Sequence, residues 1–133
     1  MKTPSRATHR VYRILVVEDN LDQVHTFALL LKEMGHSIDY AINGYVALDV
    51  ARRFKPDVIF CDLGLPGVTG FEVAEQIRRD PELKDIKLIA VTGYPQFEER
   101  ARQVGFDQVY SKPLGPKVLY DLFGDTKDGS VTG

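Results

Sequence analysis

The sequence predicts an α/β domain in which helices cover both faces of one parallel sheet. Short apolar runs rich in β-branched residues alternate with longer segments whose apolar residues recur at helical spacing. The connections are short and carry Gly, Pro, Asn or Asp, which are typical of turns and caps. Strands that alternate with helices in this way form right-handed crossovers, and these build a doubly wound parallel sheet. The 133 residues, 44% of them hydrophobic and 27% charged, suit one globular domain.

Five segments are expected to form strands. The sequences RILVV, DVIFC and KLIAV are almost continuously apolar, as in strands that are buried on both faces. SIDYA and QVYS are more polar and are expected nearer an edge or rim of the sheet. In chain order, the expected strands are 13–17, 37–41, 57–61, 87–91 and 108–111.

Cap and breaker residues predict where the helices begin and end. Asn20 and Thr69 are good N-caps, and Gln23 and Glu72 follow them three residues later, as in a capping box. A glycine after the last apolar position, such as Gly35, favours the end of a helix, and a following proline prevents its continuation. The expected helices are 21–34, 44–54, 70–79, 96–104 and 116–123.

Composition argues against several classes of function. The net charge of −2 shows no basic excess, so direct nucleic acid binding is not expected. No apolar run approaches the roughly 20 residues that cross a bilayer, and neither a membrane span nor a secretory signal is expected. The single cysteine, Cys61, cannot form an internal disulfide and is expected to pack within its strand, which suits the cytoplasm. Residues 11–123 would form the domain, with disordered tails at 1–10 and 124–133.

Polar residues follow four of the predicted strands. Glu18 and Asp19 come after the first strand, Asp62 after the third, Thr92 after the fourth and Lys112 after the fifth. Any one of them alone would be read as a cap or turn residue. In a doubly wound sheet, however, ligands bind outside the carboxyl ends of the strands, at the point where the strand order reverses. The five residues are therefore expected to converge on one site.

The residue types at these strand ends favour phosphoryl chemistry. Three carboxylates gathered together repel one another, and a hard divalent cation with oxygen ligands, such as Mg²⁺, relieves that repulsion. Lys112 offers a mobile positive charge to a phosphoryl oxygen, and Thr92 offers a hydroxyl donor. Asp62 is expected to attack an incoming phosphoryl group. The product is an acyl phosphate that water can hydrolyse, so the modification would be reversible.

Four segments resemble the receiver domains of two-component response regulators. They are VVEDN at 16–20, DLGLPGVTGFE at 62–72, VTGY at 91–94 and GFDQVYSKPL at 105–114. The resemblance extends over 11–123. It implies a flavodoxin-like (βα)5 sheet with the strand order 2-1-3-4-5.

The resemblance also implies a role for each site residue. Asp62 would be the phosphoacceptor, Thr92 the switch hydroxyl and Lys112 the phosphate-contacting lysine, with a cis bond between Lys112 and Pro113. Mg²⁺ would be bound by Asp62, by Asp19 directly, by Glu18 through water and by the backbone carbonyl of Gly64.

The resemblance further implies the partners and the kind of activity. A histidine kinase or histidine phosphotransfer protein would dock on the first helix and the 113–116 loop and supply the phosphoryl group. The chain would act as a switch rather than an enzyme, and it is expected to lack a DNA-binding output domain of its own. A downstream protein would respond to the switch.

One position departs from the pattern of the family. Many receivers carry an aromatic residue three positions before the lysine, and here that residue is Val109. Tyr110 is one position out of register, so on a strand it would face the opposite side. Receivers of hybrid histidine kinases commonly lack this aromatic too, so the chain resembles either such a receiver or a stand-alone regulator. Tyr94, two residues after Thr92, is expected on the rim of the site, where it would tune access.

Several other polar residues are expected to have no special role. His25 should lie on the exposed face of the first helix, and His36 should lie in a loop after Gly35. The pairs Arg52-Arg53 and Arg78-Arg79 are expected on solvated helix faces.

Three other functions fit the sequence less well than that of a receiver. A haloacid-dehalogenase-type phosphatase also uses an aspartate nucleophile and Mg²⁺, but it needs a second carboxylate two residues on, where this chain has Gly64. An FMN binder of the flavodoxin type needs a Ser/Thr/Gly-rich phosphate loop after the first strand, where this chain has EDN. A receiver fold kept only for binding is disfavoured because every chemical residue is present.

Overall fold

The computed structural model describes residues 10–124, and five parallel strands form its sheet in the order β2-β1-β3-β4-β5. The strands are β1 (Arg13–Val17), β2 (Ser37–Ala41), β3 (Val58–Asp62), β4 (Lys87–Thr92) and β5 (Gln108–Ser111). The helices are α2 (Leu21–Glu33), α3 (Gly44–Phe54), α4 (Gly70–Arg79), α5 (Glu98–Val104) and α6 (Pro116–Leu119). The predicted fold class and strand order are confirmed. The predicted tails, 1–10 and 124–133, lie outside the described residues except for residues 10 and 124.

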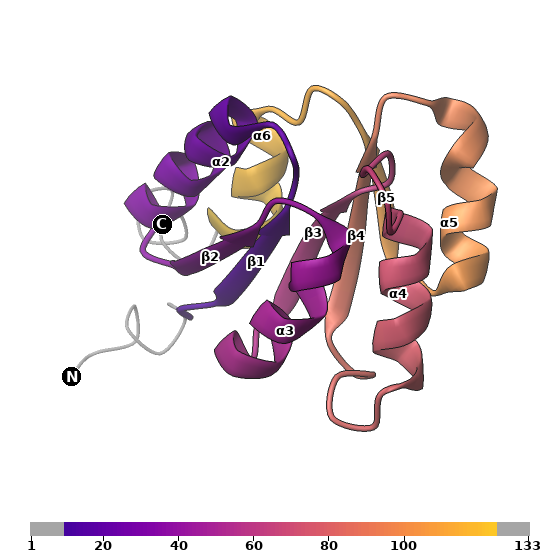
Figure 1. Ribbon diagram of the computed structural model, residues 1–133. Helices are drawn as coiled ribbons and strands as arrows, with labels where there is room; N and C mark the ends of the chain where they lie inside the picture. Colours follow the sequence, from indigo (N-terminus) through magenta and orange to yellow (C-terminus); the bar gives the residue numbers. More distant parts are fainter. Residues whose placement is uncertain (1–9, 125–133) are drawn as a thin grey trace.

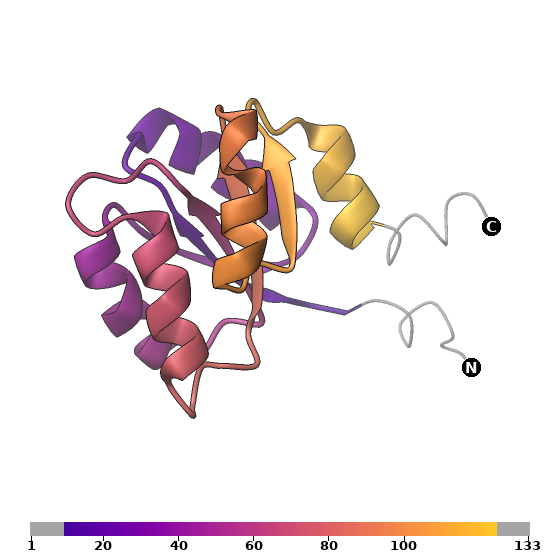
Figure 2. The same ribbon diagram turned by 90° about the vertical axis from the view of Figure 1, so that its right-hand side faces the viewer.

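Helices cover both faces of the sheet, with α2 and α6 on one face and α3, α4 and α5 on the other (Figures 1 and 2). Alternate strand residues contribute to the two cores. Leu15, Val17 and Ile59 pack against α3, α4 and α5, whereas Ile14 and Phe60 pack against α2 and α6. This alternation explains why the central strands read as continuous apolar runs. No helix of the described residues is long and apolar enough to cross a membrane.

The strand and helix limits differ from the predicted ones by small amounts. β3 begins one residue later than predicted and includes Asp62, while β4 extends to Thr92. A 3₁₀ turn, η1 (Pro95–Phe97), occupies the start of the predicted fourth helix. The predicted last helix divides into α6 and a π-helical turn, η2 (Tyr120–Gly124).

Only one of the two predicted capping boxes is complete. Thr69 and Glu72 bond reciprocally at the start of α4. At the start of α2, the Asn20 side chain accepts the Gln23 backbone N–H at 3.1 Å. The Asn20 N–H, however, donates to Oε2 of Glu18 at 3.1 Å instead of to Gln23. The first turn of α2 is therefore tied to a candidate metal ligand.

His36 lies in the loop between α2 and β2, as predicted, and its side chain is buried, with 5% of the residue exposed. Its Nδ1 accepts the Tyr12 backbone N–H at 3.1 Å, and its ring meets Tyr12 and Phe123 edge-on. The position after Gly35 predicts the loop but not the burial of the ring. The aromatic side chains that enclose the ring come from other parts of the chain. His25, in contrast, is exposed as predicted.

Arg78 was predicted on a solvated helix face and instead joins three segments at the end of α4. Its guanidinium donates to the carbonyl oxygens of Gly105 (2.7 Å), Lys84 (2.6 Å) and Ile86 (2.7 Å). It also forms an ion pair with Asp107 at 3.0 Å. Helical position alone could not reveal these partners, because they belong to loops that follow α4 and α5. The neighbouring Arg79 is exposed.

Candidate functional site

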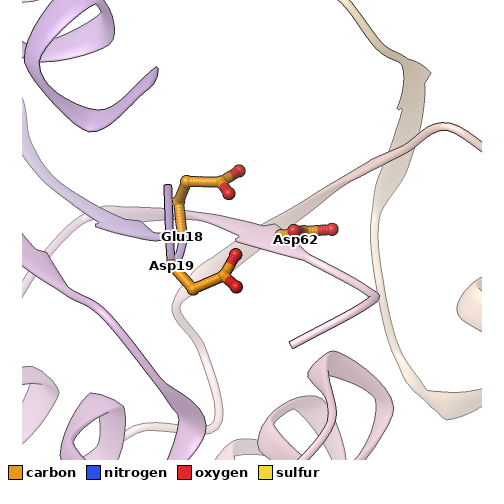
Figure 3. Close-up of side chains that lie close together, drawn as sticks. All are labelled: Glu18, Asp19 and Asp62. Atoms are coloured by element: carbon orange, nitrogen blue, oxygen red, sulfur yellow. The ribbon is translucent and has the colours of Figure 1, made fainter. Parts of the chain in front are cut away.

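Three carboxylates meet at the carboxyl end of the sheet. Ligand atoms of Glu18, Asp19 and Asp62 all lie within 4.8 Å of one another. Figure 3 shows Glu18 and Asp19 leaving the end of β1 beside Asp62 at the end of β3. Glu18 is buried, Asp62 is partly buried and Asp19 is exposed. The cluster is therefore anchored in the core on one side and open to solvent on the other.

Strand register explains why these residues meet. β1 and β3 are parallel neighbours, and Val17 pairs with Cys61, so Glu18 and Asp62 are the next residues on adjacent strands. The Glu18 N–H also donates to the Ala41 carbonyl at 3.0 Å, which extends the pairing with β2 by one step. Since β1 is the strand at which the order reverses, the cluster lies at the switch point where doubly wound sheets bind ligands.

Lys112 is the cation that faces this cluster. Its Nζ lies 3.1 Å from Oδ2 of Asp62 and 3.2 Å from Oε1 of Glu18. Burial by itself would lower the pKa of Lys112, but the hydrogen bond and charge of Asp62, with those of Glu18, outweigh it and raise that pKa. The lysine is thus held protonated between two carboxylates.

The Glu18 carboxyl has a pKa above its ordinary value. Burial is the main cause, and the negative charge of Asp62 adds to it. The Asn20 N–H and Lys112 act in the opposite direction but do not cancel the effect. Three carboxylates facing one ammonium group leave negative charge uncompensated, and this donor set suits a hard divalent cation.

Gly64 contacts the cluster through its backbone. Its N–H donates to Oδ1 of Asp62 at 3.0 Å, while Lys112 occupies Oδ2. Each carboxylate oxygen can accept more than one bond, so Asp62 keeps free acceptor positions. The resemblance had pointed to the carbonyl of this residue. The structure shows the N–H of Gly64 bonded to Asp62, and the role of its carbonyl as a metal ligand stays a prediction.

Thr92 ends β4 at the same end of the sheet, and it is buried. Its Oγ1 accepts the Tyr94 backbone N–H at 3.0 Å, and its carbonyl accepts the Lys112 N–H at 2.9 Å. Next to it, a Cβ placed on Gly93 would meet no atom within 4 Å, so the approach is open there. The structure therefore places all six predicted site residues at one end of the sheet, with the Thr92 hydroxyl turned to the loop.

A hollow of about 490 Å³ extends from the cluster along α2. Besides Glu18, Asp62 and Lys112, its lining is mainly apolar and comes from α2, the central strands and the 113–114 segment. The apolar lining includes Phe27, Leu30, Phe60, Pro113 and Leu114. This hollow was not predicted from the sequence.

The two residues in doubt on β5 face opposite sides of the sheet, as predicted. Val109 pairs with Ala90 and Tyr110 pairs with Val91. Val109 packs with the core of α3, α4 and α5, and Tyr110 with the core of α2 and α6. Thr92 lies two residues after Ala90, so Val109 shares the face of Thr92 and Tyr110 does not.

Comparison with protein-family models matches residues 14–123 to the response regulator receiver domain. The chain therefore belongs to the family of response regulator receiver domains, which act in two-component signalling. Its flavodoxin-like fold is the one this family shares. The match lies within 11–123, and the domain limits themselves stay a prediction.

Two curated relatives and one solved structure illustrate this membership. The polar-differentiation response regulator DivK of Brucella anthropi is 40% identical over 103 residues, 76% of this chain and 84% of DivK. Protein PilH of Pseudomonas aeruginosa is 36% identical over 56 residues, 42% of this chain and only 46% of PilH. The solved structure is the receiver domain of sensor histidine kinase PA1611 from Pseudomonas aeruginosa, with a magnesium ion coordinated in the active-site cleft. It is 25% identical to this chain with a TM-score of 0.77, and the match covers 86% of this chain and 95% of that domain.

Proposed function

We propose that this chain accepts a phosphoryl group from a phosphohistidine onto Asp62, in a Mg²⁺-dependent reaction, and acts as a reversible switch. One observation carries the proposal. Asp62 lies beside Glu18 and Asp19 at the switch point of the sheet, and its Oδ2 is 3.1 Å from the Lys112 ammonium. Membership of the receiver family supports the same reading.

The residues present fit a magnesium ion. Glu18, Asp19 and Asp62 supply carboxylate oxygens within 4.8 Å of one another, and the Gly64 backbone is adjacent to them. Oxygen-only ligands with an exposed side left for water are what Mg²⁺ prefers in proteins. A bound Mg²⁺ would neutralise charge on the phosphoryl oxygens. The magnesium-containing cleft of the PA1611 receiver supports this assignment.

The groups around Asp62 would act on the phosphoryl group as follows. A carboxylate oxygen of Asp62 attacks phosphorus, the P–N bond of the phosphohistidine breaks, and the imidazole leaves with the electron pair. Lys112 neutralises charge on one phosphoryl oxygen and Thr92 donates its hydroxyl to another. In a separate dephosphorylation step, water attacks phosphorus and the bond between phosphorus and the Asp62 oxygen breaks, which restores the Asp62 carboxylate and releases inorganic phosphate.

The phosphodonor would be a histidine kinase or a histidine phosphotransfer protein. The hollow along α2 supports this, because it joins Asp62 to an apolar surface formed by Phe27, Leu30 and Leu114. A docked helix could present its histidine at the open side of the cluster. The proposal includes a cytoplasmic location and an unidentified downstream protein. It includes no contact with nucleic acid, in keeping with the net charge of −2.

The alternative of a phosphatase with an aspartate nucleophile is less well supported. Position 64 has no side chain to serve as the general acid, and its N–H is bonded to Asp62. Without that acid, hydrolysis of unactivated phosphate esters should be poor. The chain would therefore act as a switch that transfers and loses one phosphoryl group, rather than as an enzyme with steady turnover.

The test is phosphorylation by a small phosphodonor such as acetyl phosphate with Mg²⁺, followed by intact-mass spectrometry. The wild type should gain one base-labile phosphoryl group, and Asp62→Asn should gain none. Asp57→Asn is a matched control, because it makes the same change next to the other end of β3, where Asp57 accepts the Arg13 N–H. It should be modified like the wild type. The proposal fails if the wild type gains no such group, or if Asp62→Asn gains it equally.

A further inference from the structure

Three aromatic rings run from the surface beside Thr92 into the core. Tyr94 is 56% exposed, and its ring lies 5.5 Å from that of Phe97. Phe97 is partly buried and meets Phe71 edge-on, also at 5.5 Å. Phe71 is 4% exposed. The outer ring of this stack thus lies at the surface, and the inner ring is held by close packing.

The stack is tied directly to the Thr92 hydroxyl. Oγ1 of Thr92 accepts the Tyr94 N–H at 3.0 Å, and the Tyr94 carbonyl accepts the Phe97 N–H at 3.0 Å. Hydrogen bonds therefore connect the Thr92 side chain to the backbone of Tyr94, and the backbone of Tyr94 to that of Phe97 in η1. A rotation of the Thr92 side chain changes the hydrogen bond that sets the position of Tyr94.

The other end of the stack reaches two helices. Phe71 lies in the first turn of α4, where Gly70 packs so closely against Asp62 that a Cβ at residue 70 would come within 2.4 Å of the Asp62 carbonyl oxygen. Arg100 of α5 lies over the Phe71 ring, 4.1 Å from its centroid. A shift of Phe97 would therefore alter the contact between the beginnings of α4 and α5.

β5 has no aromatic side chain on the face of the sheet that Thr92 occupies, so no ring of β5 is placed to follow a movement of Thr92. Val109 shares that side and is too small to move as an aromatic lever, while Tyr110 packs on the opposite face with α2 and α6. Among the described residues, the aromatic group bonded through its own backbone to the Thr92 hydroxyl is Tyr94.

We propose that Tyr94 and Phe97 relay phosphorylation of Asp62 in this chain, in place of an aromatic residue on β5. The inference rests on the proposed function, because it takes Thr92 to bond a phosphoryl oxygen on Asp62. When the Thr92 hydroxyl turns to that oxygen, its hydrogen bond with the Tyr94 N–H changes. Either that bond breaks or the Tyr94 backbone moves with the hydroxyl. The Tyr94 ring then moves against Phe97, and the packing between α4 and α5 changes with it.

Fluorine NMR of protein labelled with 3-fluorotyrosine tests the relay. The chain has six tyrosines, and the signals of two of them can be assigned with Tyr94→Phe and Tyr110→Phe. Acetyl phosphate and Mg²⁺ are added, and the phosphorylated fraction is measured by intact mass in the same sample. A second Tyr94 signal should grow in proportion to that fraction, while the Tyr110 signal stays in place. In Thr92→Val, which lacks the hydroxyl, phosphorylated protein should show no second Tyr94 signal.

The outcomes separate the relay from the proposed function. If Asp62 gains no phosphoryl group, the proposed function fails and the relay fails with it. If Asp62 is phosphorylated but the Tyr94 signal does not change, only the relay is overturned. The relay is also overturned if Tyr110 responds instead, or if Thr92→Val shows the same second Tyr94 signal as the wild type.

Discussion

The two ends of the sheet both place aspartates beside cations, but they do so in opposite ways. At the amino end, Asp57 accepts the Arg13 N–H at 2.9 Å, and Asp107 accepts both the Leu88 N–H at 2.9 Å and the Arg78 guanidinium at 3.0 Å. These carboxylates hold the starts of strands, and each is bonded to a backbone group. At the carboxyl end, three carboxylates gather together, and one lysine, Lys112, contacts two of them, Glu18 and Asp62.

The two ends differ in how the charge of their carboxylates is balanced. Backbone N–H groups bond carboxylates at both ends, since Asp62 accepts the Gly64 N–H, but at the amino end Asp107 also meets the Arg78 guanidinium, which balances its charge locally. The carboxylates at the other end crowd together, and burial and the charge of Asp62 raise the pKa of Glu18. Such crowding costs stability unless a further cation or a modification relieves it. We therefore expect substitutions at the amino end to lower the free energy of unfolding, and substitutions at the carboxyl end to weaken Mg²⁺ binding.

The largest of these effects is expected for Arg78→Ala at the amino end. Losing the guanidinium leaves the carbonyls of Gly105, Lys84 and Ile86 without their donor. Several charge-assisted hydrogen bonds are removed at once, so the free energy of unfolding should fall by about 2–4 kcal/mol. Urea denaturation measures the change, and Arg79→Ala on the exposed neighbouring position is the control. Acetyl phosphate should still modify Asp62, and a loss below about 0.5 kcal/mol would contradict the structural role of Arg78.

A smaller effect is expected for Asp19→Asn at the carboxyl end. Removing one of three carboxylates should weaken Mg²⁺ binding about tenfold or more, as measured by titration calorimetry. In the wild type, Mg²⁺ at about 100 times its dissociation constant should raise the free energy of unfolding by about 2.7 kcal/mol. Asp57→Asn should keep the wild-type affinity. Equal Mg²⁺ affinity in Asp19→Asn and the wild type would count against the assignment of Asp19 as a ligand.

The smallest effect is expected for Arg52→Ala on the helix surface. Arg52 pairs with Asp80 at 3.1 Å, but its side chain is half exposed, and water screens the interaction. The free energy of unfolding should fall by less than about 1 kcal/mol in urea denaturation. Phosphorylation of Asp62 should be unaffected. A loss as large as that of Arg78→Ala would show that a half-exposed ion pair matters as much here as the partly buried carbonyl contacts of Arg78.

Much of the fold could be predicted because its signals are local. Apolar runs, N-caps and helix-ending glycines depend on neighbours in sequence, and all five strands lie within one residue of their predicted limits. The strand-end residues were found for a related reason. Once the sheet is parallel, Glu18, Asp62 and Lys112 must lie at the same end of it, whatever the side chains do.

The contacts that cross between elements could not be predicted in this way. Arg78 and Arg79 look alike on a helix, yet only Arg78 meets the loops at 84–86 and 105–107. The apolar hollow beside the cluster likewise forms only when α2 and the 113–114 segment flank the site.

The sequence by itself determined the parallel sheet, its order of elements and the set of residues at its carboxyl end. Only the tertiary structure decided that His36 is enclosed by Tyr12 and Phe123, and that Arg78 reaches the carbonyl of Gly105. The physical reason is that secondary structure follows from short-range periodicity and capping. Which polar groups become partners depends instead on distances between segments that are far apart in the chain.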